Sequence, residues 1–302
     1  WRAAFDANRK LLAALPETQP AALAKAAGAL VDAGEHVARI ADAREPLLQA
    51  IERAPGTPEI ARSLERVYEA TGEKRALAAL LVERSGREGN ASEKTRLRLR
   101  AADLLLDAGL AAAAWDLVEA ALAAEPESLD ALFLQGRAQV AFGRPEDALD
   151  VLGALALRQQ GKRTPLMGRT HFEIAKAHLM RDDLFEALEA LDYAAGIDRR
   201  SEEIALLLGL VALDLGDEKT AERALTAITT MPPRKDGGGG ADAATKALAF
   251  YHLAAIAYAK GDAGRAKRLA WRAVDAGDPA HSAARALLDR LEVHAPAAGS
   301  HP

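Results

Sequence analysis

His171 and His178 stand seven residues apart, a spacing that places both imidazoles on one face of a helix. Two imidazoles on one face could share a metal ion. A zinc site needs three or four ligands, and no further His or Cys lies nearby in the sequence. We therefore interpret both histidines as packing or hydrogen-bonding residues, and we expect neither a metal nor a cofactor.

Other residues whose types suggest chemistry lack the required context. The stretch 161–164, Gly-Lys-Arg-Thr, has the ending of a phosphate-binding loop, but the earlier glycine is missing and a helical segment precedes it where that motif has a strand. Adjacent carboxylates at Asp182 and Asp183 stand where a turn is expected, and turns favour Asp for local hydrogen bonding. No Ser/His/Asp set or nucleophile motif has a convincing context. The sequence therefore predicts no enzyme.

A basic run is the remaining charged feature. Six cations stand close together between two of the helical segments: Arg84, Arg87, Lys94, Arg96, Arg98 and Arg100. Spread around a helix they form a solvated face, and binding of acidic partners or nucleic acid is the alternative. The net charge of −5 argues against a nucleic-acid surface as the main purpose.

The composition is that of a helical protein. Half of the 302 residues are hydrophobic and only 4% are aromatic, and no run of alternating β-branched residues suggests a strand. The absence of cysteine excludes disulfides and Cys-based sites. It does not decide between cytoplasm and periplasm, and of these two compartments we favour the cytoplasm. No apolar stretch reaches the 18 or so residues of a membrane span. Because the chain opens at Trp1, we expect a processed piece of a longer protein.

Small residues recur along the chain at a fixed period. The anchors at 109 and 143 are 34 residues apart, as are those at 182 and 216, and the full set is Gly109, Gly143, Asp182, Gly216 and Gly261. Seven residues before each anchor stand Ala102, Gly136, Ala175, Gly209 and Ala254, and five after it stand Ala114, Ala148, Ala187, Ala221 and Ala266. Such a period predicts stacked helix pairs, because one pair cannot bury its apolar face alone.

Each period reads as a first helix, a tight turn and a second helix. In one unit the first helix is expected over about 130–142, Gly143 ends it in the left-handed conformation, and the second begins near Pro145. Asp182 takes the place of the glycine in the next unit. We expect the small residues to let the two helices approach, with Leu152, Leu191 and Leu225 filling the space between helices.

This pattern resembles the tetratricopeptide repeat family. A pentatricopeptide RNA reader has a similar period but gives no reason for the Gly-then-Ala pair. The resemblance implies an all-α, right-handed α-solenoid superhelix of about seven helix pairs. The expected parts are degenerate helical repeats over 1–57, repeats over about 58–91, 95–128, 129–162, 168–201, 202–235 and 247–280, a Gly-rich loop at 232–242, a capping helix over 281–293 and a disordered tail over 294–302. Residues 161–167 are interpreted as a further insertion between repeats.

The resemblance also implies which side chains line the concave face. In this family the first helix of each pair supplies them, which here gives Phe133, Arg137, Val140, Phe172, Lys176, Leu179, Leu206, Leu210, Leu213, Tyr251 and Tyr258. An apolar groove with a basic pair at one end suits an amphipathic helix or apolar peptide that carries acidic residues. The alternative is that curvature or a homodimer buries these side chains.

One function known in the family does not fit. Modules that grip a chaperone's C-terminal carboxylate use Lys, Asn and Arg at five positions where this chain has Phe133, Arg137, Glu173, Glu203 and Leu207. Three hypotheses remain. The chain is a scaffold or adaptor that holds a partner peptide or helix in its groove, a sensing or regulatory module of a larger signalling protein, or a homo-oligomeric structural subunit.

Overall fold

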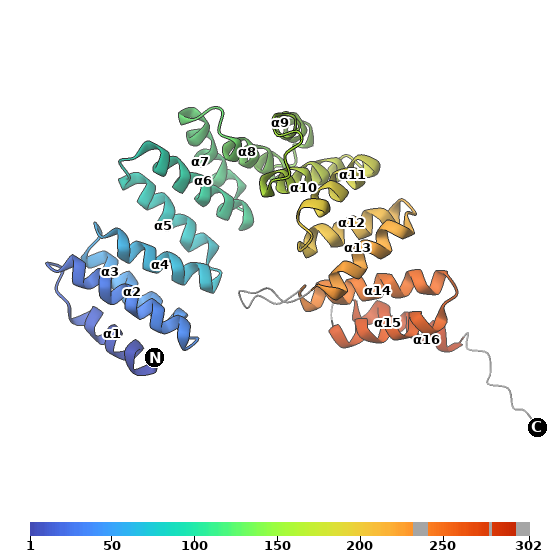
Figure 1. Ribbon diagram of the computed structural model, residues 1–302, viewed down its shortest axis with the longest axis horizontal. Helices are drawn as coiled ribbons and strands as arrows, with labels where there is room; N and C mark the ends of the chain where they lie inside the picture. Colours follow the sequence, from blue (N-terminus) through green and yellow to red (C-terminus); the bar gives the residue numbers. More distant parts are fainter. Residues whose placement is uncertain (232–240, 278–279, 294–302) are drawn as a thin grey trace, which may run out of the picture. The chain divides into compact units, whose positions relative to one another are not determined.

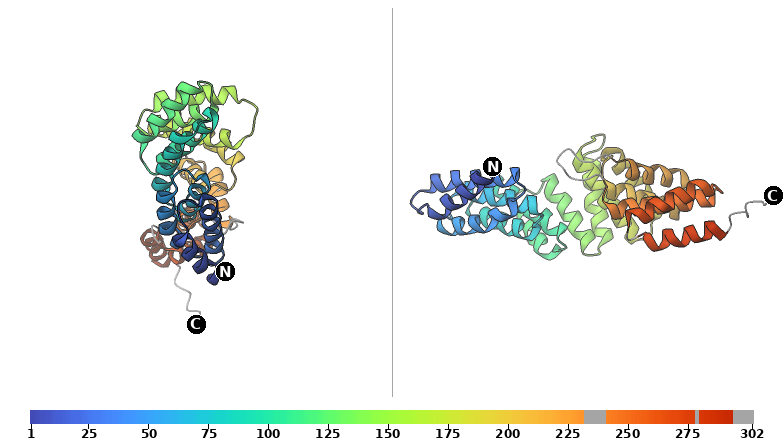
Figure 2. Two further views of the ribbon diagram at one scale, coloured as in Figure 1. Left: turned by 90° about the vertical axis from the view of Figure 1, so that its left-hand side faces the viewer. Right: turned by 90° about the horizontal axis from the view of Figure 1, so that it is seen from below.

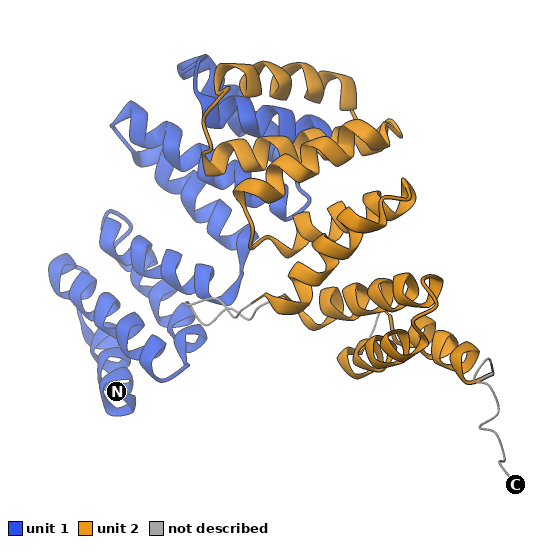
Figure 3. Cartoon of the chain, turned by 45° about the vertical axis from the view of Figure 1, so that its right-hand side comes forward, with its two compact units in different colours: residues 1–142 blue, residues 143–302 orange. Residues whose placement is uncertain are grey.

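The computed structural model describes residues 1–231, 241–277 and 280–293, and within these ranges every regular element is helical. The chain forms two compact units, unit 1 over Trp1–Phe142 and unit 2 over Gly143–Pro302 (Figure 3). The boundary falls at the turn inside the predicted repeat 129–162, although the sequence suggests one uninterrupted stack.

Unit 1 is a series of helices in which each contacts its sequence neighbour (Figure 1). Its core is apolar, with Phe5, Leu30, Leu47 and Leu64 all buried. The helices are α1 (Arg2–Ala14), α2 (Pro20–His36), the 3-10 helix η1 (Ile40–Ala43), α3 (Arg44–Arg53), α4 (Pro58–Thr71), α5 (Lys74–Arg87), α6 (Ala91–Asp107), α7 (Ala111–Ala124) and α8 (Leu129–Ala141). The break between α1 and α2 spans residues 15–19, and Pro20 starts α2.

Unit 2 continues the same plan in its own set of pairs, which Figure 2 shows side by side. Helix α10 packs on α11, α12 on α13 and α14 on α15, and α16 covers the last pair by contacting α14 and α15. The helices are α9 (Pro145–Arg158), α10 (Pro165–Met180), α11 (Leu184–Ile197), α12 (Glu202–Asp214), α13 (Glu218–Thr230), α14 (Ala243–Ala259), α15 (Ala263–Ala276) and α16 (His281–Val293).

The small residues occupy the places that the repeat predicts. The five alanines after the anchors are fully buried: Ala114, Ala148, Ala187, Ala221 and Ala266. All five anchors have positive φ, from 64° at Asp182 to 77° at Gly261. Because a left-handed residue reverses the chain in one step, the second helix of each pair begins at once and packs on the first.

Side chains in the turns set the helix starts. Pro20, Pro58, Pro145 and Pro165 open their helices, where the missing N–H has no intrahelical partner to lose. Ser128, Thr164, Ser201, Asp217, Asp242 and Asp262 each accept a backbone N–H three residues on.

The two predicted insertions differ from expectation in detail. Residues 165–167 are not loop, because Pro165 starts α10 and Thr164 caps it; the insertion is therefore shorter than 161–167. Of the predicted Gly-rich loop, 232–240 lie outside the described residues, while Ala241 is buried and Asp242 caps α14. The predicted tail, 294–302, also lies outside them.

Candidate protein-binding surface

In unit 2 three helices carry a stripe of predicted groove residues each. On α12 these are Leu206, Leu210 and Leu213, whose spacing of four and then three residues places them on one helix face. On α14 they are Tyr251 and Tyr258, seven residues apart. All five side chains are half-buried, and α12 contacts α14. We call these five residues the apolar row; they retain surface that a partner could cover.

The stripe on α10 is built differently. Phe172 is only 8% exposed and belongs to the core between α10, α11 and α12. The Lys176 ammonium lies 4.2 Å from the centroid of its ring, and Leu179 is half-buried beside the same core. A cation over a ring face is favourable but hides the ring further. Phe172 therefore supports the fold and offers a partner little surface.

Two further predicted groove residues lie in unit 1, on α8. Phe133 is 2% exposed, so it too is a packing residue, whereas Val140 is half-buried. At Phe133 and Phe172 the burial agrees with the alternative that the fold itself buries groove side chains. Phenylalanine is among the residue types that are most often fully buried in proteins.

The predicted basic pair is already neutralised within the fold. Arg137 pairs with Asp103 and, at 2.5 Å, with Asp107. Lys176 Nζ lies 3.2 Å from Glu173 Oε1 and 3.8 Å from Glu203 Oε1. Because each cation has two carboxylates beside it, neither offers an unpaired charge to an acidic partner. The expectation that these cations select an acidic peptide loses its basis.

Arg137 is one rung of a regular arrangement in unit 1 that the sequence analysis missed. An arginine on each of three helices reaches two carboxylates on the preceding helix of the row α2, α4, α6 and α8. The rungs are Arg66 with Asp32 and Glu35, Arg100 with Glu65 and Glu69, and Arg137 with Asp103 and Asp107. We call this set the arginine ladder. A signal existed, since Arg66 and Arg137 both stand six residues before a turn glycine, at 72 and 143.

The ladder lowers the pKa of one of its carboxyl groups, that of Asp107. Burial opposes the shift at Asp107, but hydrogen bonds from Lys74, at 2.9 Å, and from Arg137 lower its pKa. At Arg66 burial by itself would lower the pKa of the guanidinium, but the hydrogen bonds to Asp32 and Glu35 raise it. The corresponding face of unit 1 is thus charged and internally paired, in contrast to the apolar row of unit 2.

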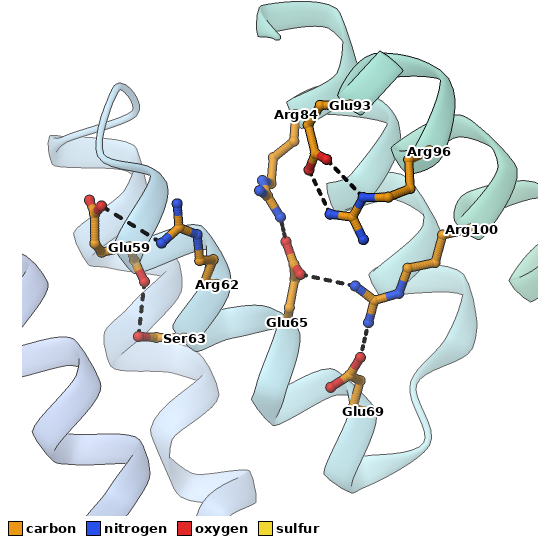
Figure 4. A network of polar contacts seen from close by, with 9 residues as sticks. All are labelled: Glu59, Arg62, Ser63, Glu65, Glu69, Arg84, Glu93, Arg96 and Arg100. Atoms are coloured by element: carbon orange, nitrogen blue, oxygen red, sulfur yellow. Dashed lines mark hydrogen bonds and ion pairs between the residues drawn. The ribbon is translucent and has the colours of Figure 1, made fainter. Parts of the chain in front are cut away.

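The basic run belongs partly to the ladder, as Figure 4 shows. The side chain of Arg84 is 18% exposed and pairs with Glu65, which is 9% exposed and also meets Arg100. Arg96 binds Glu93 at 2.6 Å on the surface, and Arg87 binds Glu83 at 2.7 Å. Arg84 is therefore a partly buried ion-pair partner and not part of a solvated face.

Two solved structures are similar to this chain over most of its length. A tetratricopeptide repeat protein from Parabacteroides merdae is 15% identical, with a TM-score of 0.55 over 89% of this chain and 98% of its own. The fold is that of a tetratricopeptide-repeat protein. A chain of the APC/C hetero-tetramer Cut9–Hcn1 is 14% identical, with a TM-score of 0.51 over 96% of this chain and 52% of its own. No protein-family model and no curated protein matches the chain.

The histidines have separate roles in this tetratricopeptide fold. The ring of His171 lies 4.0 Å from that of Tyr193, centroid to centroid, whereas His178 Nδ1 lies 3.4 Å from Asp183 Oδ2. They share no ligand site. Over the part of the chain that the structure describes, no group of three or more His, Cys, Asp or Glu is placed to hold a metal ion, and no helix has the length and apolarity to span a membrane.

Proposed function

We propose that the chain is a protein-interaction scaffold that holds a helix or an apolar peptide of a partner protein against the apolar row of unit 2. The observation that carries the proposal is the partial exposure of five large apolar side chains on two contacting helices, Leu206, Leu210, Leu213, Tyr251 and Tyr258. Large apolar side chains that remain accessible together are typical of interaction sites, and tyrosine is enriched among the residues that carry binding energy.

The charges near the row favour an apolar ligand without an acidic requirement. Lys176 already has Glu173 and Glu203 beside it, so burying a partner's carboxylate there would need one of these pairs to break. The proposal assigns binding and no reaction, because the row contains no nucleophile, acid or base other than two phenols.

The likeness to known structures supports a role in assembly. The Cut9–Hcn1 complex is a hetero-tetramer of two different proteins, and the matching chain aligns with 96% of this one. A fold made of stacked pairs suits this use, since each added pair lengthens the surface that faces a partner.

A photo-crosslinking residue placed at position 210 tests the proposal in the native host. We expect covalent products of defined mass that contain a second protein. The matched control carries the same residue at Thr226, which is exposed on α13, and should give none of these products. Products that contain only further copies of this chain would favour a homo-oligomer, and identical products from both positions would contradict the proposal.

A further inference from the structure

A cavity lies in unit 2 and shares no lining residue with the apolar row. A cavity of about 620 Å³ opens between α9, α10 and the end of α11. Leu157 of α9, Met167 and His171 of α10 and Tyr193 of α11 form its walls, and Gln160 and Arg163 stand at the loop between α9 and α10. This volume is in the range of small-molecule sites.

The loop that shapes this cavity is the insertion found in the sequence, and the fold fixes it at several points. Gly161 turns the chain with φ of 79°, and Lys162 N donates to Gln159 O at 3.0 Å. Arg163 Nη2 donates to Gly196 O at 3.0 Å, which ties the loop to the end of α11. A Cβ at Gly196 would stand 3.1 Å from the guanidinium nitrogen, so the glycine leaves room for the Arg163 side chain. These hydrogen bonds fix the loop, which therefore forms a defined wall of the cavity.

One wall is aromatic and uncharged at neutral pH. The rings of His171 and Tyr193 lie 4.0 Å apart at 35°. Burial lowers the pKa of His171, although the carboxylate of Glu189 opposes the shift. The imidazole and the phenol ring thus pack against each other at a tilt, and a ligand ring can make an aromatic contact with this pair.

The charge of the cavity has one sign. None of its lining residues is acidic, and Arg163 is the lining residue that is always charged. Arg163 is exposed, and within the described ranges its guanidinium makes the single hydrogen bond to Gly196 O. The guanidinium can thus still bind a carboxylate with two parallel N–H donors. Leu157, 71% exposed, leaves apolar surface at the rim that a ligand would cover.

We propose that this cavity binds a small aromatic carboxylate, with its ring against Tyr193 and Leu157 and its carboxylate on Arg163. An aromatic cation is disfavoured because no acidic side chain lines the site. A purely apolar ligand would leave the Arg163 guanidinium without a counter-charge at the mouth. The inference does not depend on the proposed scaffold function, since the two sites have no residue in common.

The test uses 2-naphthoate as the probe and isothermal titration calorimetry on the full chain. We expect wild-type protein to bind 2-naphthoate at least tenfold more tightly than the neutral analogue 2-naphthylmethanol. Arg163→Met should raise the Kd for 2-naphthoate by tenfold or more and leave the Kd for the alcohol unchanged. The neighbouring Lys162→Met removes one charge outside the lining and should bind 2-naphthoate like wild type.

A cavity-filling variant tests the location. Gly153 lines the cavity and a Cβ there meets nothing within 4 Å, so Gly153→Met fills the space while strengthening helix α9. It should abolish binding, whereas Gly86→Met, an equally open helical site on α5, should not. Unchanged binding in Gly153→Met, equal affinity for acid and alcohol, or no binding of 2-naphthoate would each overturn the proposal. Binding only of a peptide that ends in a tryptophan carboxylate would also overturn it.

Discussion

The side chain of Leu225 lies directly over the backbone of Gly209. A Cβ added to Gly209 would stand 2.8 Å from both Cγ and Cδ2 of Leu225, closer than side-chain carbons approach. Gly209 is one of the small residues seven positions before a turn, and Leu225 is fully buried on the second helix of the same pair. The absence of a side chain at Gly209 is thus what lets α12 and α13 come together.

This relationship predicts the effect of adding one methyl group. Gly209→Ala should lower the free energy of unfolding by about 1 kcal/mol, because overpacking of about 1–3 kcal/mol exceeds the gain in helix propensity. Urea unfolding measures it. Gly86→Ala, where a Cβ meets nothing within 4 Å, should instead gain up to about 1 kcal/mol. The penalty at position 209 should vanish in a Leu225→Ala background, and its persistence there would refute the assigned contact.

The buried carboxylate of Glu65 predicts a second stability effect. Glu65→Ala leaves the partly buried Arg84 and Arg100 without their shared partner, and removing one member of a buried pair costs about 3 kcal/mol. Glu59 pairs with Arg62 at 4.0 Å on the surface, so Glu59→Ala should cost less than about 1 kcal/mol. Chemical unfolding of both variants compares them. Equal losses would show that Glu65 is no more important than a solvated residue.

The arginine ladder predicts the titration of a particular carboxyl group. Arg137→Gln removes a donor that lowers the pKa of Asp107, so this pKa should rise toward its ordinary value. NMR titration of the Asp107 carboxyl carbon reads it directly. Arg66→Gln changes a rung that does not touch Asp107 and should leave the titration as it is. An unchanged pKa of Asp107 in Arg137→Gln would contradict the electrostatic role of the arginine ladder.

Two half-buried histidines predict a loss of stability in mild acid. Burial lowers the pKa of His171 and of His252, with Glu189 and Asp214 respectively opposing the shift. Because the pKa of each imidazole is lower in the folded protein, the unfolded chain takes up protons at a higher pH than the folded protein does. The stabilisation is therefore complete above the free imidazole pKa of about 6.5 and is lost as the pH falls through the folded value. The fall in Tm between pH 7 and pH 5 should be smaller in His171→Asn/His252→Asn, and an unchanged fall would contradict this explanation.

The helix pairs were predictable because their determinants are local. Gly143 and Asp182 turn the chain by their own conformational preferences. The alanines five residues later are then buried where the two helices of a pair pack together. Exposure was less predictable, because it depends on neighbours from other helices. Phe133 and Phe172 occupy predicted groove positions yet are buried, while Leu206 at the equivalent position is half-buried.

The cavity near Tyr193 could not be predicted from spacing. Its wall includes Arg163, which donates to Gly196 O, 33 residues away, and Thr164 of the same loop caps α10. A contact between a loop and the far end of another helix leaves no periodic trace in the sequence. The ion pairs of Arg66 and Arg137 did leave one, in their equal distance from a turn glycine.

The most direct test of the scaffold function is the affinity of the protein captured at position 210 for a charged variant of the apolar row. Leu210→Lys keeps a good helix former and can extend its ammonium into water, so folding should be retained. We expect its Kd for the captured protein to rise at least tenfold, while Thr226→Lys on α13 binds like wild type. Wild-type affinity in Leu210→Lys, with a normal Tm, would contradict the assignment of the apolar row as the binding surface.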